Sequence, residues 1–257
     1  MTTMAAELAN EQQQLQNRQL AGVILKNAVK SDVDVPNTNP PQRAKAWMTV
    51  VGPAEKATIK QAILGCLGSP VSQARHTSAQ VVAGIGVLEL PQNQWPDLIQ
   101  GLVNNVTQSN NDYLKQSSLE AIGYICEEVD PAVLSTQGHV ILTAVIQGMR
   151  KEEPNLEVRL AGTTALSNAL EFVKTNFENE VERNYIMQTV CETTQCDTKK
   201  EVKVAAYECL VQIAELYYDK LPQYMSALYQ LTLAAIQKAT MDQESDDVGQ
   251  QAVEFWT

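Results

Sequence analysis

Histidines, cysteines and adjacent carboxylates are the side chains that could do chemistry in this sequence. His76 and His139 lie about sixty residues apart, so no histidine-based triad or HExxH metal site is apparent. Cys191 and Cys196 have a poor spacing for shared metal ligation and are more simply core or boundary residues. The adjacent carboxylates are most simply solubility charges; they are Glu127 and Glu128, Glu152 and Glu153, and Asp246 and Asp247.

Motifs for nucleotide binding are also missing from the sequence. It contains no GxxxxGK[ST] loop and no GxGxxG pattern after a strand. The sequence therefore predicts a protein that is not an enzyme and that uses neither a cofactor nor a metal. Its function is expected to lie in binding.

Composition indicates an all-α protein. Of the 257 residues 44% are hydrophobic and only 5% are aromatic, which is typical of helices more than of sheets. The net charge of -11 argues against nucleic acid and favours basic protein partners. The five cysteines form no CxxC pair and are expected to be reduced core thiols. The sequence has no 18-residue apolar run and no secretory leader, so membrane insertion is not expected.

The chain repeats itself with a period in the forties. The origin of each repeat is taken as a basic residue in the first five repeats and as Gly249 in the sixth. The third residue on is always small, and the seventh is always large and apolar. The small residues are Ala21, Ser78, Ser118, Gly162, Ala206 and Ala252, and the large ones are Leu25, Val82, Ile122, Leu166, Leu210 and Trp256. Both sets fall on one helical face, where a small residue admits a neighbouring helix and the large one fills the space beside it.

This period predicts a HEAT-repeat α-solenoid, a right-handed superhelix of antiparallel helix pairs. One set of helices, here called B helices, is predicted near 14–30, 71–88, 111–128, 155–175, 199–218 and 246–257. The A helices lie between them and begin near Pro53, Pro96, Val133, Asn179 and Pro222. Pro36, Pro40 and Pro41 are predicted to punctuate a loop. We expect one uninterrupted array over residues 1–257, without polar capping repeats, as in a fragment of a longer array.

Several segments resemble the importin-β (karyopherin-β) family. They are NRQLAGVILKN, ELPQNQWPDLI, LEAIGYICE, ILTAVIQGMRKEEP, NYIMQTVCETTQC and AVEFW, in the same order and at a similar spacing as in the N-terminal half of that family. The resemblance covers nearly the whole chain and includes loops and A helices as well as core positions.

The resemblance implies a nuclear import receptor of the cytoplasm, the nucleus and the nuclear pores. Its partners would be phenylalanine-glycine (FG) repeats of nucleoporins, Ran-GTP, and cargo or importin-α. Compared with the family, the first few helices and the C-terminal half are expected to be missing. The Ran site would then be incomplete, and importin-α or cargo would bind regions absent here. The alternative is a HEAT scaffold that organises another complex, such as a phosphatase.

The segment ILTAVIQGMR has more apolar width than one core requires. Ile141, Leu142, Ala144, Val145, Ile146 and Met149 cover an arc of roughly 200° on a helix, about twice the usual stripe. The arc could pack on two neighbouring helices, as is normal in a solenoid. Alternatively, Leu142, Thr143 and Ile146 line an exposed groove between adjacent A helices.

The next A helix, VERNYIMQTV, also has surplus apolar width. The two helices could form a shallow slot with an apolar floor and a polar rim from Glu182. The resemblance points to the same slot as the FG-nucleoporin site, formed by Leu142, Thr143, Ile146, Glu182, Tyr185 and Ile186. For Ran, the resemblance points to Lys26 and Asn27 at the end of the first B helix. Without it, Lys26 could equally be a solvated lysine at a helix end.

Overall fold

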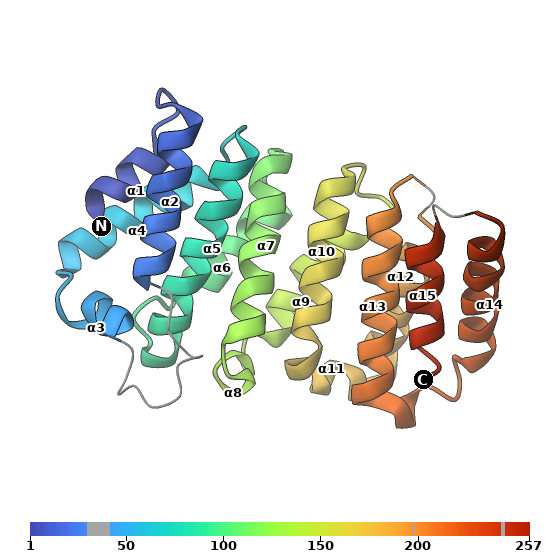
Figure 1. Ribbon diagram of the computed structural model, residues 1–257. Coiled ribbons are helices and arrows are strands. Elements are labelled where there is room, and N and C mark those ends of the chain that lie inside the picture. The colour runs from blue at the N-terminus through green and yellow to red at the C-terminus, as the bar shows by residue number, and fades with distance from the viewer. Residues whose placement is uncertain (30–41, 197, 243–244) are drawn as a thin grey trace. The chain divides into compact units, whose positions relative to one another are not determined.

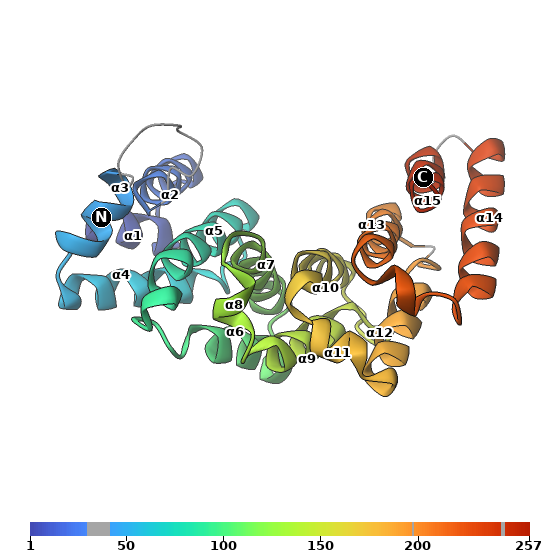
Figure 2. The same ribbon diagram turned by 90° about the horizontal axis from the view of Figure 1, so that it is seen from below.

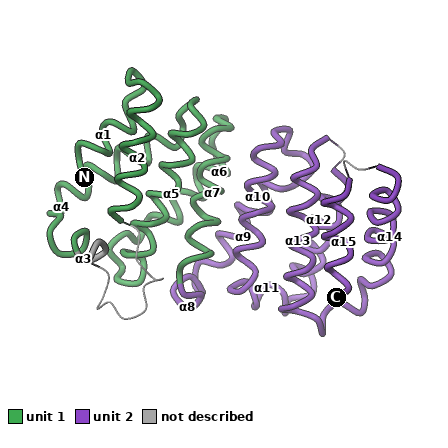
Figure 3. Tube along the Cα trace, viewed as in Figure 1, with its two compact units in different colours: residues 1–129 green, residues 130–257 purple. Residues whose placement is uncertain are grey.

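The computed structural model describes residues 1–29, 42–196, 198–242 and 245–257 (Figure 1). Within these ranges the chain forms α-helices and short 3-10 helices, and no strand. The predicted all-α fold is therefore confirmed. The helices form two compact units, Met1–Val129 and Asp130–Thr257 (Figure 3). The expected continuity of one array across both units stays a prediction.

Unit 1 consists of helix pairs. Its helices are α1 (Thr2–Ala9), α2 (Leu15–Val29), α3 (Gln42–Thr49), α4 (Pro53–Cys66), α5 (Ser72–Glu89), α6 (Leu98–Gln108) and α7 (Asp112–Glu128), with a 3-10 turn η1 (Leu90–Gln92) after α5. The B helices are α2, α5 and α7, and α5 packs against both of the others. Figure 2 shows α4 and α6 on one side of the unit, with α5 and α7 beside them.

Unit 2 repeats this arrangement. Its helices are α8 (Pro131–Leu134), α9 (Gly138–Met149), α10 (Leu156–Ala169), α11 (Lys174–Glu178), α12 (Glu180–Thr193), α13 (Lys200–Tyr217), α14 (Met225–Met241) and α15 (Asp246–Glu254). The 3-10 turns η2 (Leu170–Phe172) and η3 (Tyr218–Lys220) follow α10 and α13. The B helices α10, α13 and α15 pack in sequence, and α9 and α12 lie on one side of them (Figure 2).

Asparagine side chains start several of these helices. The Asn155 Oδ1 atom accepts hydrogen bonds from the backbone N–H groups of Glu157 (2.9 Å) and Val158 (3.2 Å) at the start of α10. Asn111 and Asn179 cap α7 and α12 in the same way. Such caps satisfy backbone donors that have no partner within the helix and are typically worth about 1 kcal/mol each. They fix where each helix of a pair begins.

The small and large positions of the repeat form the core, with one exception. The small residues are buried in all six repeats, and the large ones are buried in the first five. Trp256 differs because α15 ends at Glu254, so its ring lies beyond the helix and is 45% exposed. Its indole N–H donates to Thr232 Oγ1 at 3.0 Å instead of filling the core.

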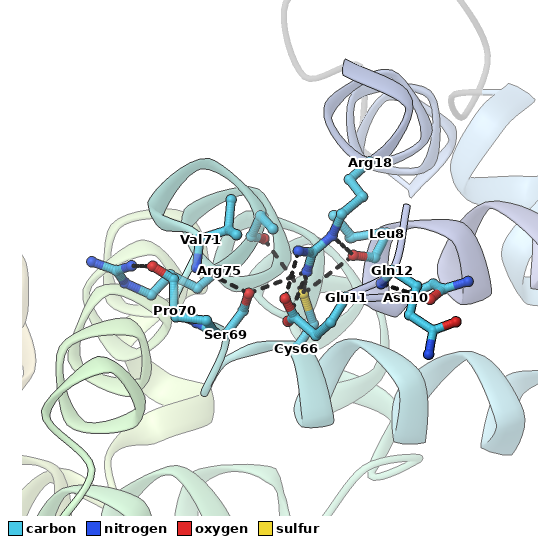
Figure 4. A network of polar contacts seen from close by, with 11 residues as sticks. Leu8, Asn10, Glu11, Gln12, Arg18, Cys66, Ser69, Pro70, Val71 and Arg75 are labelled. Atoms are coloured by element: carbon cyan, nitrogen blue, oxygen red, sulfur yellow. Dashed lines mark hydrogen bonds and ion pairs between the residues drawn. The ribbon is translucent and has the colours of Figure 1, made fainter. Parts of the chain in front are cut away.

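The basic residue of the first repeat connects α2 to neighbouring elements. Arg18 is buried, and its Nε donates to the Leu8 carbonyl at 2.8 Å (Figure 4). Its two terminal nitrogens donate to the carboxylate of Glu11 at 2.8 and 3.0 Å, and one also donates to Ser69 Oγ at 3.1 Å. One guanidinium therefore links α1, α2 and the turn after α4.

Some helix bounds differ from those expected. The helix predicted near 155–175 ends at Ala169, because the chain forms the turn η2 and then a separate short helix that leads into the Asn179 cap. The A helix expected near Val133 is interrupted, so that α8 ends at Leu134 and α9 begins at Gly138. The loop predicted at Pro36, Pro40 and Pro41 lies outside the described residues.

Candidate functional site

The helix α9 is apolar around most of its circumference. The helix α9 packs against α10, and at Gly162 α10 comes close to the backbone of Val145 and Met149, whose side chains are buried. Leu142 and Ile146 lie on the side of α9 that lines a groove toward α12. One part of the α9 surface therefore packs on a neighbouring helix, and another part lines an exposed groove.

The helix α12 supplies the facing wall. Its start is fixed by Asn179, whose Oδ1 accepts from the backbone N–H of Val181 at 3.0 Å. The carboxylate of Glu182 is held by Asn176 Nδ2 at 2.5 Å and by Asn179 Nδ2 at 3.4 Å. One turn further on, Tyr185 and Ile186 line the same groove as Glu182.

The structure brings all six of the predicted FG-site residues to one cavity of about 370 Å³ in unit 2, here called the α9–α12 groove. Four further residues line it that sequence reasoning missed. They are His139, Gln147, Arg150 and Val181. Helical spacing could have found them, since residues three and four positions apart share a helix face: His139 precedes Leu142 and Thr143, and Val181 precedes Tyr185.

The walls of the α9–α12 groove are more accessible than its floor. Leu142 and Ile146 are 6% and 4% exposed, whereas Tyr185 is 48% and Val181 is 77% exposed. Thr143 is exposed as well, and its hydroxyl donates to the His139 carbonyl at 2.8 Å. A bound group would therefore meet a shallow apolar floor between two raised edges.

The rim of the groove carries both signs of charge. Glu182 lines it on α12, and Arg150 lines it just after the end of α9. The Arg150 side chain lies 4.0 Å from the Glu152 carboxylate, a distance typical of a weak surface pair. An uncharged ligand with an apolar ring matches this lining better than a strongly charged one.

The two residues predicted for Ran are neighbours in α2 and differ in burial. Lys26 is half-buried near the end of α2, and Asn27 is exposed. Lys26 lines a cavity of about 230 Å³ in unit 1, whereas Asn27 does not. The other lining residues are Gln80, Ala83, Gly84, Tyr124, Glu127 and Glu128. Burial, and then the charge of Glu120, raises the pKa of the Tyr124 hydroxyl.

Other chemistry-bearing side chains have partners within the fold. His76 Nδ1 lies 2.5 Å from Glu120 Oε2. Cys191 and Cys196 form no disulfide, and Cys196 Sγ accepts from Arg159 Nη1 at 3.5 Å. Among the described residues no group of His, Cys, Asp and Glu could hold a metal ion. In the same part of the chain, no helix is both long and apolar enough to cross a membrane.

Two family models match the chain. The model described as the importin-beta N-terminal domain matches residues 2–69. The model described as IPO5-like, TPR repeats matches residues 70–231. Together they cover residues 2–231, which include α9 and α12.

Known proteins are similar over the full chain. Importin subunit beta-1 of Schizosaccharomyces pombe is 47% identical over 259 aligned residues, which are 100% of this chain and 29% of that protein. A solved structure of Kap95p with RanGDP is 38% identical with a TM-score of 0.86, and one of a Kap95:Nup1 complex is 39% identical with a TM-score of 0.82. Each covers 99% of this chain, which spans 29% of the solved chain.

Proposed function

The chain belongs to the importin-β family, and from that membership we propose that it acts in nuclear import by binding FG repeats of nucleoporins in the α9–α12 groove. It acts by binding and not by catalysis. One observation carries the proposal: the six residues selected from the sequence lie on two different helices and line a single groove. The similarity to Kap95, which forms a complex with Nup1, supports it.

The chemistry of the groove suits a phenylalanine between glycines. The ring would leave water for the floor formed by Leu142 and Ile146, between the edges formed by Tyr185 and Val181. Glycines beside it let the peptide backbone lie flat across the helices. Burying about 100 to 150 Å² of ring contributes only a few kcal/mol before ordering costs. Each contact is therefore weak, and many such contacts along a disordered chain would give retention without arrest.

The test is a titration of the chain with an FG peptide, followed by NMR. Tyr185→Ser removes the aromatic ring from one edge of the groove, and Val181→Asp places a charge at the rim. Each variant should weaken FG binding about threefold or more. Both positions are exposed, so neither variant should unfold the protein. Tyr218→Ser is the matched control, since Tyr218 is 78% exposed and does not line the groove. Parent-like affinity in both groove variants would refute the proposed site.

Ran-GTP is proposed as a second partner, in contact with Lys26 and Asn27. The similarity to Kap95p, whose binding induces the switch loops of RanGDP to adopt the GTP-bound conformation, supports this proposal. Lys26→Ala should weaken capture of Ran-GTP, whereas Lys174→Ala, on the exposed surface of unit 2, should not. Equal capture by all three proteins would remove Lys26 from the contact.

Cargo and importin-α are proposed to bind outside the 257 residues described by this sequence. The chain spans 29% of the length of its relative, and the family resemblance implies that importin-α binds elsewhere. A basic importin-α segment should therefore not be captured by this chain. The protein would reside in the cytoplasm and the nucleus and at the nuclear pores. Tight capture of the basic segment in a pull-down would contradict this placement of the importin-α site.

A further inference from the structure

Unit 1 contains a second groove, larger than the first. It lies between α4 and α6, here called the α4–α6 groove, and has a volume of about 710 Å³. Figure 2 shows these two helices on one side of unit 1. Its lining includes Glu11, Gly65, Trp95, Asp97, Gly101 and Leu102.

Two glycines keep the α4–α6 groove open. A Cβ atom added to Gly65 on α4 or to Gly101 on α6 would meet no other atom within 4 Å. Glycine in a helix interior costs roughly 1 kcal/mol relative to alanine, and neither of these glycines is required by close packing. Because they have no side chain, each leaves a flat stretch of helix surface in the lining of this groove.

The surface between these glycines is apolar. Leu98 and Leu102 of α6 form buried parts of the lining, and Leu64 and Leu114 form half-buried parts. Trp95, which lies just before the start of α6, is also part of the lining. A planar ring can lie flat on helix surface that has no Cβ, which makes this lining suited to an aromatic side chain.

The charge of the α4–α6 groove differs from that of the α9–α12 groove. Its lining includes the carboxylates of Glu11 and Asp97 and contains no lysine, arginine or histidine. Glu11 is paired with Arg18 through two hydrogen bonds (Figure 4). Asp97 is exposed and forms no ion pair with any cation in the part of the chain that the structure describes. Lys60, which stands over the Trp95 ring, is itself paired with the buried Glu89.

We propose that the α4–α6 groove is a second peptide site, which takes an aromatic residue between glycines when a lysine or arginine stands beside it. The ring would lie over Gly65 and Gly101, and the cation would stand beside Asp97. The choice of an FG-type peptide rests on the proposed function, whereas the preference for a basic neighbour rests on the lining of this groove alone. The α9–α12 groove, lined by both Glu182 and Arg150, should discriminate less.

The experiment compares three peptides that share one glycine-rich frame. The first carries lysine beside the phenylalanine, the second carries aspartate there, and the third replaces phenylalanine with serine. NMR reports each groove separately, through the Gly65 and Gly101 amides and the Trp95 indole N–H for one and the Ile146 and Ile186 methyls for the other. The lysine peptide should bind the α4–α6 groove about two- to tenfold more tightly than the aspartate peptide, and the serine peptide should not shift these signals.

Two variants test the geometry and the charge independently. Gly101→Leu fills the groove from a position where an added Cβ meets nothing, and it should abolish the shifts in the α4–α6 groove. Asn104→Leu is its control, because Asn104 is exposed on the same helix outside the lining. Asp97→Asn should leave the phenylalanine requirement intact and remove most of the preference for lysine, and low salt should enhance that preference in the parent.

The outcomes separate this inference from the proposed function. Shifts confined to the α9–α12 groove would overturn the second site and leave the first intact. Shifts at Gly65 and the Trp95 indole that persist in Gly101→Leu would also overturn it. Shifts in the parent that do not depend on the charge beside the phenylalanine would do the same. Shifts in the α4–α6 groove alone would support the second site while the proposed site failed.

Discussion

A Cβ atom on Gly162 would stand 2.9 Å from the backbone nitrogen of Met149. The same atom would lie 3.1 Å from the Val145 carbonyl oxygen, so α10 touches the backbone of α9 itself and not only its side chains. This contact sets how far α9 stands from the core of unit 2. Because Leu142 and Ile146 are on the same helix, it also sets the depth of the α9–α12 groove.

Gly162→Ala should lower the free energy of unfolding by about 1 to 3 kcal/mol, since rigid backbone atoms cannot move away from the added methyl group. Urea unfolding measures this loss. Gly65→Ala is the matched control, because an added Cβ there meets nothing and alanine favours the helix. An unchanged midpoint for Gly162→Ala would mean that the two helices can separate without cost.

Replacing Arg18 should cost far more than replacing its partner. Arg18 is 1% exposed, and Arg18→Met would remove its hydrogen bonds to the Leu8 carbonyl and to Ser69, at a cost of about 2 to 4 kcal/mol. Glu11 is half exposed, so Glu11→Gln should cost less than about 1 kcal/mol. Urea unfolding of the two variants gives the comparison. Equal losses would show that the ion pair, and not the link to the buried carbonyl, carries the stability.

Mild acid should weaken unit 1 through Glu11. Burial raises the pKa of the Glu11 carboxyl, but hydrogen bonds from Arg18 and Ser69 and the charge of Arg18 outweigh it, so the pKa lies below its usual value. The stabilisation is therefore present above the pKa of the unfolded chain, about 4.3, and is lost as pH falls through the lower folded value. Between pH 6 and about pH 3, the parent should lose more unfolding free energy than Glu11→Gln. If the unfolding free energies of the parent and of Glu11→Gln fell in parallel with pH, Glu11 would not be the origin of the acid sensitivity.

Alkali should weaken unit 2 through Tyr217. Its hydroxyl donates to the Leu170 carbonyl, and its ring stacks on Phe177 with centroids 4.1 Å apart. Burial, followed by the charges of Glu171 and Glu178, raises the pKa of Tyr217 to about 12. Because this value exceeds the unfolded pKa of about 10, the stabilisation is complete below pH 10 and is lost as pH rises toward 12.

The variant Tyr217→Phe should lose about 1 kcal/mol at neutral pH and show a weaker decline in alkali than the parent. Thermal unfolding between pH 8 and 11 provides the measurement. Tyr218→Phe, at an exposed position, should behave as the parent does. A variant curve that declines as steeply as the parent would assign the alkaline loss to other groups.

Helical spacing predicted the helices and the surplus apolar surface of α9, whereas the family resemblance pointed to the six residues of the groove. The surplus apolar width around Leu142 and Ile146 is a property of helical spacing, which is written in the chain itself. The break between Leu134 and Gly138 is not, since no proline or strong turn motif separates α8 from α9. Trp256 fitted the repeat pattern but lies past the end of α15, because the pattern alone does not give helix ends.

The α4–α6 groove was missed because its cause is an absence of side chains. Gly65 and Gly101 occur in different helices, and only the packed structure shows that both face open space. The family resemblance pointed to Lys26 and Asn27 as a pair, and in the structure only Lys26 lines the neighbouring cavity. Adjacent positions on a helix point about 100° apart, so one partner need not accompany the other.

The most direct test of FG binding is a spin-labelled FG peptide added to chain with labelled isoleucine methyl groups. The account predicts that the methyl signals of Ile146 and Ile186 broaden strongly, that Tyr185→Ser reduces this effect, and that unlabelled FG peptide reverses it. A peptide that binds saturably while both methyl signals stay sharp would contradict the assignment of the α9–α12 groove.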